Sequence, residues 1–378
     1  MTHFFDLDPP AMEALLADLG MARFRAKQLR QWVYQRGVTD PDAMTDFAKA
    51  DRAKLAEAIV FHRWRVERDA LASDGTRKLL LQANVAAGDG APPPRTECVM
   101  IPAESRDSGK SRRTACISSQ VGCPVGCRFC ASGLGGLEAD LTTGQVLEQV
   151  WWLNRVMQAD PPGAGSPPAP DADRGDAVGP PPFGAVSNIV FMGMGEPLSN
   201  FAAVLPAIRA LAADWAFGIS ARRITLSTVG LPAQVRRLAD QLDLPITLAL
   251  SLHAPNDALR RRLIPWARRV SIDQLVDACR YYFERTGREI TLEYILLREV
   301  NDRPEHAREL ARVARRLRAN VNLIRYNEVA SLPYQRPATD DVIAFQRIVK
   351  QAGVACHIRA SRGRDIAAAC GQLRHENA

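Results

Sequence analysis

The sequence predicts an α/β fold, a partial parallel β/α barrel preceded by a small helical domain. From residue 114 onward, strand-like segments alternate with amphipathic helical segments, the pattern of a parallel sheet with helices outside it. Residues 1–70, in contrast, have helical patterning. A doubly wound sheet would give the same alternation of strands and helices. In either architecture, ligands bind at the C-terminal ends of the strands.

Residues 1–70 are predicted to form a helical accessory domain. A helix over 11–20 ends on a glycine that can cap it. A second helix, over 25–37, gathers its apolar residues on one face before it stops at a glycine, and a third is expected over 43–59. The region carries eleven basic and eleven acidic side chains, so it is neutral overall.

Residues 71–113 are predicted to be a connecting β segment. An Asp-Gly pair indicates a turn within 73–82, followed by a strand, and 98–102 is the next strand candidate. The barrel itself is expected over 114–378. Its strands are expected at 115–120, 187–193, 223–228, 246–252, 290–297 and 321–326, and its helices at 143–158, 200–213, 232–241, 256–263, 271–286, 304–319 and 339–352.

One segment breaks this alternation. Residues 158–184 contain eight prolines and five glycines. Such a composition cannot bury enough apolar surface to fold, so we expect a flexible surface insert.

The composition restricts where the protein works. The longest apolar stretch, 244–252, is too short to span a bilayer, and the acidic N-terminus does not resemble a signal peptide. We therefore expect a cytoplasmic protein without membrane association, whose cysteines stay reduced and serve as metal ligands or catalysts. The net charge is +7, and arginines gather at 259–269, 307–318 and 358–364. Such runs suit a phosphate-rich partner, although part of each would also suit a solvated helix face.

Three cysteines follow the first predicted barrel strand. Cys123, Cys127 and Cys130 have the spacing C-x3-C-x2-C within eight positions. Thiolates are soft ligands for iron–sulfur clusters or zinc, but a structural zinc site needs four ligands, and no second pair of cysteines is evident. Three cysteines on a four-iron cluster would leave one iron free to bind a small molecule.

This spacing after the first strand of a β/α chain resembles the radical S-adenosylmethionine superfamily. "FMGMGEPL" (191–198) similarly resembles the Gly-Glu-Pro element of that superfamily at the end of the second strand. Further segments narrow the resemblance to the RlmN/Cfr family of RNA adenine methyltransferases, over residues 20–374. These segments are "FRAKQLRQWVYQRG", "SSQVGC", "GMGEPL", "ITLSTVG", "SLHAPND", "LEYILLREVND" and "SRGRDIAAACGQL".

The resemblance implies a radical S-adenosylmethionine fold and three catalytic residues. Cys370 would accept a methyl group from one S-adenosylmethionine and, after hydrogen abstraction by a radical made from a second, add it to carbon 2 of an adenine as a methylene. Glu97, just before an extended segment, would take the proton from the ring carbon. Cys116 would then attack the sulfur of Cys370, which releases the methylated RNA and leaves a transient disulfide.

The resemblance also implies the ligands and partners. A [4Fe-4S] cluster would be held by Cys123, Cys127 and Cys130, with S-adenosylmethionine as methyl donor and radical source. The implied substrates are 23S rRNA, at the peptidyl transferase centre, and tRNA, next to the anticodon. A flavodoxin-like or ferredoxin-like protein would supply electrons to a monomeric enzyme. The residues implied for S-adenosylmethionine binding are Gly195, Glu196, Ser227, Ser251, Leu252, His253 and Asn327.

Two alternatives remain open at this stage. A methyltransferase of the same family that acts on carbon 8 of adenine would use the same cysteines. A non-catalytic RNA-binding protein with a structural metal would need neither Cys116 nor Cys370. It would also cleave no S-adenosylmethionine.

Overall fold

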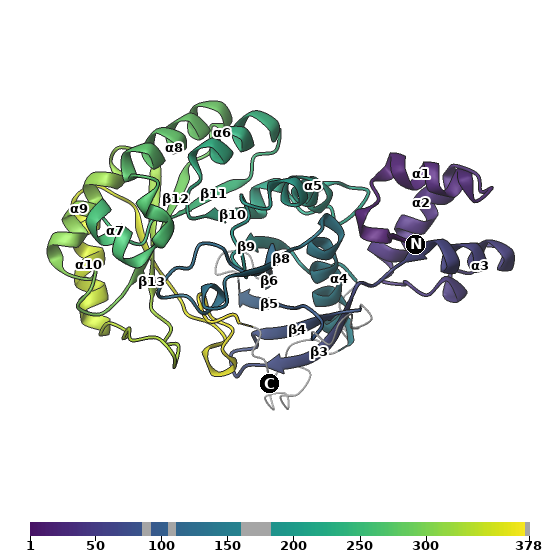
Figure 1. Ribbon diagram of the computed structural model, residues 1–378, viewed down its shortest axis with the longest axis horizontal. Coiled ribbons are helices and arrows are strands. Elements are labelled where there is room, and N and C mark those ends of the chain that lie inside the picture. Colours follow the sequence, from purple (N-terminus) through teal and green to yellow (C-terminus); the bar gives the residue numbers. More distant parts are fainter. Residues whose placement is uncertain (85–91, 105–110, 160–182, 375–378) are drawn as a thin grey trace, which may run out of the picture.

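A computed structural model describes residues 1–84, 92–104, 111–159 and 183–374. These residues build a ten-stranded sheet in the order β14-β13-β12-β11-β10-β9-β6-β5-β4-β3 (Figure 1). From β6 to β14 all neighbouring strands are parallel. The parallel strands are β6 (Ser111–Cys116), β9 (Asn188–Phe191), β10 (Ile224–Thr228), β11 (Thr247–Ser251), β12 (Ile290–Leu296), β13 (Ala319–Arg325) and β14 (Cys356–Arg359).

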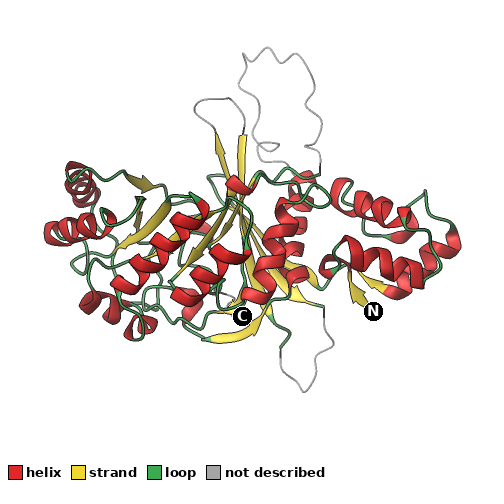
Figure 2. Ribbon diagram, turned by 90° about the horizontal axis from the view of Figure 1, so that it is seen from above, coloured by secondary structure: helices red, strands yellow, loops and turns green. Residues whose placement is uncertain are grey.

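The sheet is an open barrel, because its two end strands, β14 and β3, do not pair with each other. This confirms the predicted partial barrel. Helices lie along its outer side (Figures 1 and 2). They are α4 (Thr143–Ala159), α5 (Phe201–Ala212), α6 (Pro232–Gln241), α7 (Asp257–Leu263), α8 (Ile272–Thr286), α9 (Pro304–Ala314) and α10 (Thr339–Gln351). None of the helices in the described part of the chain is both long and apolar enough to traverse a bilayer.

Local sequence sets the helix ends. In α8, the Ser271 side chain accepts the backbone N–H of Gln274, and the Gln274 side chain accepts the backbone N–H of Ser271. Gly287, at positive φ, ends the helix. The helix predicted over 304–319 ends earlier, at Ala314, because β13 already begins at Ala319.

Three antiparallel strands extend the sheet beyond β6. They are β3 (Trp64–Leu71), β4 (Arg77–Ala83) and β5 (Arg95–Glu104), and the turn between β3 and β4 contains the predicted Asp-Gly pair, with Gly75 at φ +79°. The proline-rich insert predicted at 158–184 falls mainly outside the described residues, as does part of the segment between β5 and β6.

The first barrel strand was predicted at 115–120, and this placement is wrong. β6 ends at Cys116, and its ladder stops after Ile117, whose backbone N–H donates to Val190. The next residue, Ser118, donates its N–H to the Gln149 side chain and its hydroxyl to the Glu97 carbonyl. Side-chain hydrogen bonds thus replace the ladder. The chain then forms a separate two-stranded sheet of β7 (Gln120–Gly122) and β8 (Leu137–Asp140).

The N-terminal helices lie at one end of the molecule (Figure 1). They are α1 (Pro9–Asp18), α2 (Phe24–Arg30) and α3 (Lys49–Ala58), and the short parallel pair β1 (Thr2–His3) and β2 (Ile59–Val60) joins the ends of this region. Glu148 of α4 is completely buried beneath it. Its carboxylate lies 3.2 Å from His3 Nε2 and 3.1 Å from His62 Nδ1, and it accepts the backbone N–H of Trp64.

Replacing Glu148 with glutamine should weaken this junction. Removing one partner of a buried ion pair lowers the free energy of unfolding by about 3 kcal/mol. Urea unfolding would measure this loss, with Glu57→Gln on the exposed surface of α3 as the control.

Burial opposes the charge on Glu148, but His3 and His62 outweigh it and lower its pKa. Burial also opposes the charge on His3, but Asp6 and Glu148 raise its pKa.

The signs of these two shifts give a pH dependence. The Glu148 contribution is present above its unfolded pKa and is lost as pH falls through its lowered folded pKa. The His3 contribution is complete below its unfolded pKa, about 6.5, and is lost as pH rises through its raised folded pKa. The junction should therefore be most stable in mildly acidic solution. Equal stability of both variants at every pH would contradict this account.

Candidate active site

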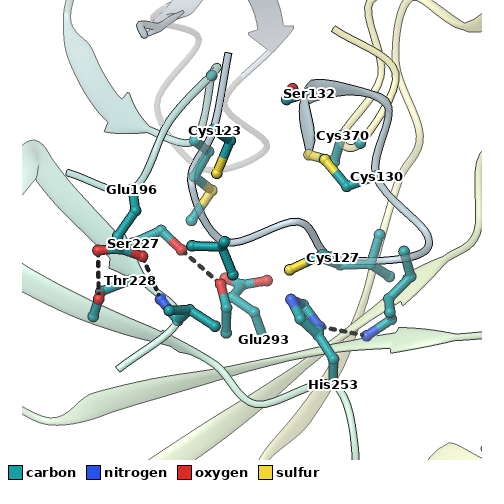
Figure 3. Close-up of a pocket in the computed structure, with 18 of the residues that line it drawn as sticks. Cys123, Cys127, Cys130, Ser132, Glu196, Ser227, Thr228, His253, Glu293 and Cys370 are labelled. Carbon is teal, nitrogen blue, oxygen red and sulfur yellow. Dashed lines mark hydrogen bonds between the residues drawn. The ribbon is translucent and has the colours of Figure 1, made fainter. Parts of the chain in front are cut away.

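A cavity of about 150 Å³ opens where the parallel strands end. Its walls come from the cysteine loop after β7, from the ends of β9 to β12, from β14 and from the C-terminal segment (Figure 3). The residues that line it and that the sequence had singled out are Cys123, Cys127, Cys130, Gly195, Glu196, Ser227, Ser251, His253 and Cys370. The fold therefore brings most of the predicted site to the predicted edge of the sheet.

The cysteine loop is held by backbone hydrogen bonds from outside it. Cys123 donates its N–H to Gly136, and Arg128 donates to Leu263 at the end of α7. On its far side, Ala131 donates to Gly371 at 2.8 Å, so the loop is tied directly beside Cys370. Figure 3 shows Cys370 next to Cys130, with Glu196 and Ser227 across the cavity.

The three thiols suit a cluster better than a single ion. Within the described residues, no three His, Cys, Asp or Glu side chains converge closely enough to hold one metal ion. A four-iron cluster binds each thiolate to a different iron, which needs cysteines arranged around a larger body. Burial raises the pKa of Cys123 to about 12 and raises that of Cys127 and Cys130 as well. These shifts mean that burial disfavours the thiolates, and binding a cationic cluster would offset this free-energy cost.

Glu196 is fixed at the cavity by hydrogen bonds to its carboxylate. Its carboxylate accepts from the Leu198 N–H and the Thr228 hydroxyl through Oε1, and from the Val229 N–H through Oε2 at 2.7 Å. These bonds join the loop after β9 to the end of β10. Gly195 beside it has φ +103°, and a Cβ there would lie 2.6 Å from Ser119 Oγ, so only glycine fits.

The strand ends beside Glu196 add further polar groups to the wall. The hydroxyls of Ser227 and Ser251 lie 3.1 Å apart, and His253 accepts the Ile295 N–H at Nδ1. Burial and the nearby Arg260 lower the pKa of His253 to about 3, so its ring is neutral. Leu252 is completely buried and does not line the cavity.

The prediction that the 259–269 arginine run contacts a phosphate-rich partner is wrong for Arg260. Its side chain is completely buried and donates to the carbonyl oxygens of Val229 and Leu252, so it braces the strand ends and is not available to a phosphate. Arg261 and Arg262, which follow it, are exposed.

A smaller cavity of about 50 Å³ adjoins the first, and Cys370 lines both. Cys116 and Asn327 line the smaller one, and Asn327 Nδ2 donates to the Cys370 carbonyl at 3.2 Å. Two cysteines from opposite ends of the barrel sequence thus face one space. Burial raises the pKa of Cys116 to about 12, Cys370 adds to the shift, and Arg359 opposes it.

Glu97 lines neither cavity. It lies on β5 two positions before Val99, which is opposite Cys116 in the strand register, so Glu97 and Cys116 face the same side of the sheet. Only 3% of Glu97 is exposed, and its Oε1 lies 2.9 Å from Lys78 Nζ.

Two charged residues that line the cavities, and Lys78 beside Glu97, were missed by sequence reasoning. Arg359 of β14 lines both cavities, and its Nη1 lies 3.1 Å from Met192 Sδ. Glu293 of β12 lines the larger one; Asn322 donates to its Oε1, while its buried Oε2 has no hydrogen-bond partner among the described residues. A charged residue in a wholly buried strand was the available signal for Glu293. Lys78 carried no such signal.

The buried, unpartnered Oε2 of Glu293 also bears on the fit of S-adenosylmethionine. That molecule is a cation with several N–H and O–H donors, and a buried acceptor in the wall needs such a donor. The cavity contains this acceptor together with the hydroxyls of Ser227 and Ser251. The residues present therefore suit S-adenosylmethionine beside a cluster on the three cysteines.

An open parallel sheet with three cysteines of one loop at its strand ends defines a radical S-adenosylmethionine enzyme, and residues 183–311 match the family model of that superfamily. Residues 2–61 match the ribosomal RNA large subunit methyltransferase N-terminal domain. The chain belongs to the RlmN family of radical S-adenosylmethionine methyltransferases.

Two relatives support this assignment. The chain is 44% identical, over 94% of its own length and 93% of the other's, to a probable dual-specificity RNA methyltransferase RlmN of Synechococcus sp. (strain CC9311). It is 39% identical to a radical SAM methyltransferase from Sphaerobacter thermophilus of known crystal structure. That match covers the whole of both chains with a TM-score of 0.86.

Proposed function

We propose that this protein methylates carbon 2 of an adenosine in 23S rRNA, at the peptidyl transferase centre, and of an adenosine next to the anticodon in tRNA. The observation that carries the proposal is the shared cavity of Cys116 and Cys370, which adjoins the cavity of the three-cysteine loop. A methyltransferase that moved a methyl group directly to RNA would need neither cysteine. The dual specificity named for the Synechococcus relative supports both substrates.

In this proposal Cys123, Cys127 and Cys130 hold a [4Fe-4S] cluster, and S-adenosylmethionine binds along the wall of Gly195, Glu196, Ser227, Ser251 and His253. Asn327 would contact it from the adjoining cavity. A cluster held by the three cysteines would supply one electron for the reductive cleavage of S-adenosylmethionine and would accept one electron from the RNA later in the cycle. Leu252 supports the wall from behind, since it is buried.

The protein residues perform the covalent chemistry. Carbon 2 of adenine is electrophilic, so a methyl cation equivalent does not react there. The Cys370 thiolate instead takes the methyl group of a first S-adenosylmethionine by nucleophilic displacement. After the radical from a second molecule removes one hydrogen atom, the methylene on Cys370 forms a carbon–carbon bond to the ring.

Two further residues finish the reaction. As the ring gives up one electron, the C2–H bond breaks, its electron pair stays in the ring, and its proton passes to Glu97. Cys116 then attacks the sulfur of Cys370: the S–S bond forms, the C–S bond breaks, and its electron pair takes up a proton to give the methyl group. An external thiol or protein reductant returns the disulfide to two thiols.

We further propose that the enzyme acts as a monomer in the cytoplasm, with a flavodoxin-like or ferredoxin-like electron donor. The exposed Arg261 and Arg262, together with residues 1–70, are proposed to contact RNA phosphates.

Removing one cluster ligand should abolish the radical chemistry. We expect Cys127→Ala, purified without oxygen, to lose the brown iron–sulfur absorbance and the cleavage of S-adenosylmethionine, because two thiolates do not retain the cluster. Cys279→Ala, a buried cysteine of α8, is the matched control and should keep both. Zinc in place of iron in the wild-type protein would overturn the assignment.

The product decides which carbon is methylated. Mass spectrometry of nucleosides from treated 23S rRNA and tRNA, compared with standards, should detect 2-methyladenosine in both. Detection of 8-methyladenosine would instead show that the enzyme methylates carbon 8 of adenine. Unmodified RNA together with uncleaved S-adenosylmethionine from a cluster-loaded protein would support a non-catalytic RNA-binding role.

A further inference from the structure

The turn between β3 and β4 holds the segment that carries Cys370. Asp74 accepts the Gly363 N–H through Oδ2 at 3.0 Å, and Ser73 donates its N–H to Asp365 Oδ2 at 2.8 Å. In Figure 1 the C-terminal segment runs beside β4 and β5. The antiparallel strands that precede the barrel therefore position the C-terminal cysteine.

Lys78, on β4 just after this turn, makes a different contact with the same segment. Its Nζ donates to the Ala367 carbonyl at 3.3 Å and also lies 2.9 Å from Glu97 Oε1. One ammonium group thus joins the carboxylate on β5 to the backbone three residues before Cys370. The Lys78 side chain is 16% exposed and that of Glu97 4%, so the contact lies largely out of water.

The strand register places this contact on the face of the sheet that carries Cys116. Lys78 is opposite Val99, and Val99 is opposite Cys116 on the next strand. Directly opposed residues share one face, so Lys78 and Cys116 lie on the same side. Val99 and Cys116 pack there against Ala368 of the C-terminal segment.

A buried ammonium fixes a carboxylate more tightly than an exposed one does, because little water competes for either group. The carboxylate must reach a ring carbon that is itself attached to Cys370. If the carboxylate and the cysteine segment moved independently, the distance for proton transfer would vary, and small displacements are costly for such steps.

We propose that Lys78 is a positioning residue for proton removal from the adenine ring, because its ammonium fixes the Glu97 carboxylate against the segment that carries Cys370. The inference rests on the proposed function, in which Glu97 takes that proton. Lys78 itself exchanges no proton in the step: the C2–H bond breaks, its electrons stay in the ring, and the proton moves to Glu97.

The test separates positioning of the base from anchoring of the segment. Lys78→Met, Lys78→Arg and Asp74→Asn would be prepared without oxygen, and cluster content would be checked by absorbance. Each would react with a transcript of the 23S rRNA peptidyl transferase region. Peptide mass spectrometry measures S-methylation of Cys370, and denaturing gels measure the covalent protein–RNA adduct and the released RNA.

We expect Lys78→Met to methylate Cys370 and form adduct, but to release product at least about tenfold more slowly, so that adduct accumulates. Lys78→Arg should restore release, because it keeps a cation with N–H donors for both partners. Asp74→Asn should slow Cys370 methylation and adduct formation together, without accumulation, because Asp74 anchors the segment without contacting Glu97. Should Lys78→Met fail to load its cluster, Lys78→Gln, which keeps an N–H donor for Ala367, should show the same accumulation.

Identical behaviour of Lys78→Met and Asp74→Asn would mean that Lys78 only anchors the segment, and wild-type release from Lys78→Met would mean that it does not act on this step. Failure of the proposed function gives a different result: the wild-type enzyme would then show no S-methyl group on Cys370, whatever residue occupies position 78.

Discussion

Replacing Cys370 with alanine should reduce RNA methylation at least about a thousandfold, while cleavage of S-adenosylmethionine continues. We expect the two effects to separate because, in the proposed mechanism, Cys370 carries the methyl group and the three-cysteine loop that would hold the cluster stays intact. Cys370 lines both cavities, which is where the proposal needs the residue that would link radical generation to the RNA. Methyl incorporation into RNA and formation of 5′-deoxyadenosine, measured in the same reaction, would show this separation.

Cys279→Ala is the matched control for this experiment as well. Cys279 is buried in α8 and lines neither cavity, so its loss should cost some stability and leave both measurements near wild type. Methylation of RNA by Cys370→Ala would show that the methyl group reaches RNA by another route.

Replacing Cys116 with alanine should stop the reaction one step later. The methylene bridge between Cys370 and the RNA would form, but no thiol would be present to displace the RNA from sulfur. We expect a protein–RNA adduct approaching one RNA per enzyme, stable on a denaturing gel and sensitive to ribonuclease. Cys98→Ala, a buried cysteine on β5 that lines neither cavity, is the control and should release its product.

The environment of Cys116 gives this step a pH dependence. Burial and Cys370 raise the pKa of its thiol to about 12, with Arg359 opposing them, and the attacking species is the thiolate. Release of RNA from the wild-type adduct should therefore accelerate as pH rises from neutral to alkaline. Multiple turnovers by Cys116→Ala, or a release rate independent of pH, would contradict a resolving role for Cys116.

The open barrel and its helices were predictable, because buried, mostly apolar strands such as β12 alternate with amphipathic helices. β14 was missed: it has four residues, and two of them, His357 and Arg359, are charged or polar. The position of β6 was wrong because a hydrogen bond from Ser118 to Gln149 ends the ladder, and sequence patterns do not show contacts between distant side chains.

The candidate site, like the fold, was predictable only in part. The spacing of the cysteine loop is local in sequence, so its convergence could be predicted from the chain alone. The roles of Cys116 and Cys370 came from the family resemblance and stay predictions, although the two residues do face one cavity. Lys78 contacts Glu97 on β5 and Arg359 contacts Met192 just after β9, and nothing near either residue in sequence indicates its partner.

The central claim is that the methyl carbon passes through Cys370 as a methylene, and deuterium reports this directly. In a reaction with S-adenosylmethionine that carries a fully deuterated methyl group, one deuterium should move to 5′-deoxyadenosine and one solvent hydrogen should replace it. Mass spectrometry of the modified adenosine should then find a methyl group with two deuterium atoms and one hydrogen. A methyl group that keeps all three deuterium atoms would mean direct transfer to RNA and would contradict the account.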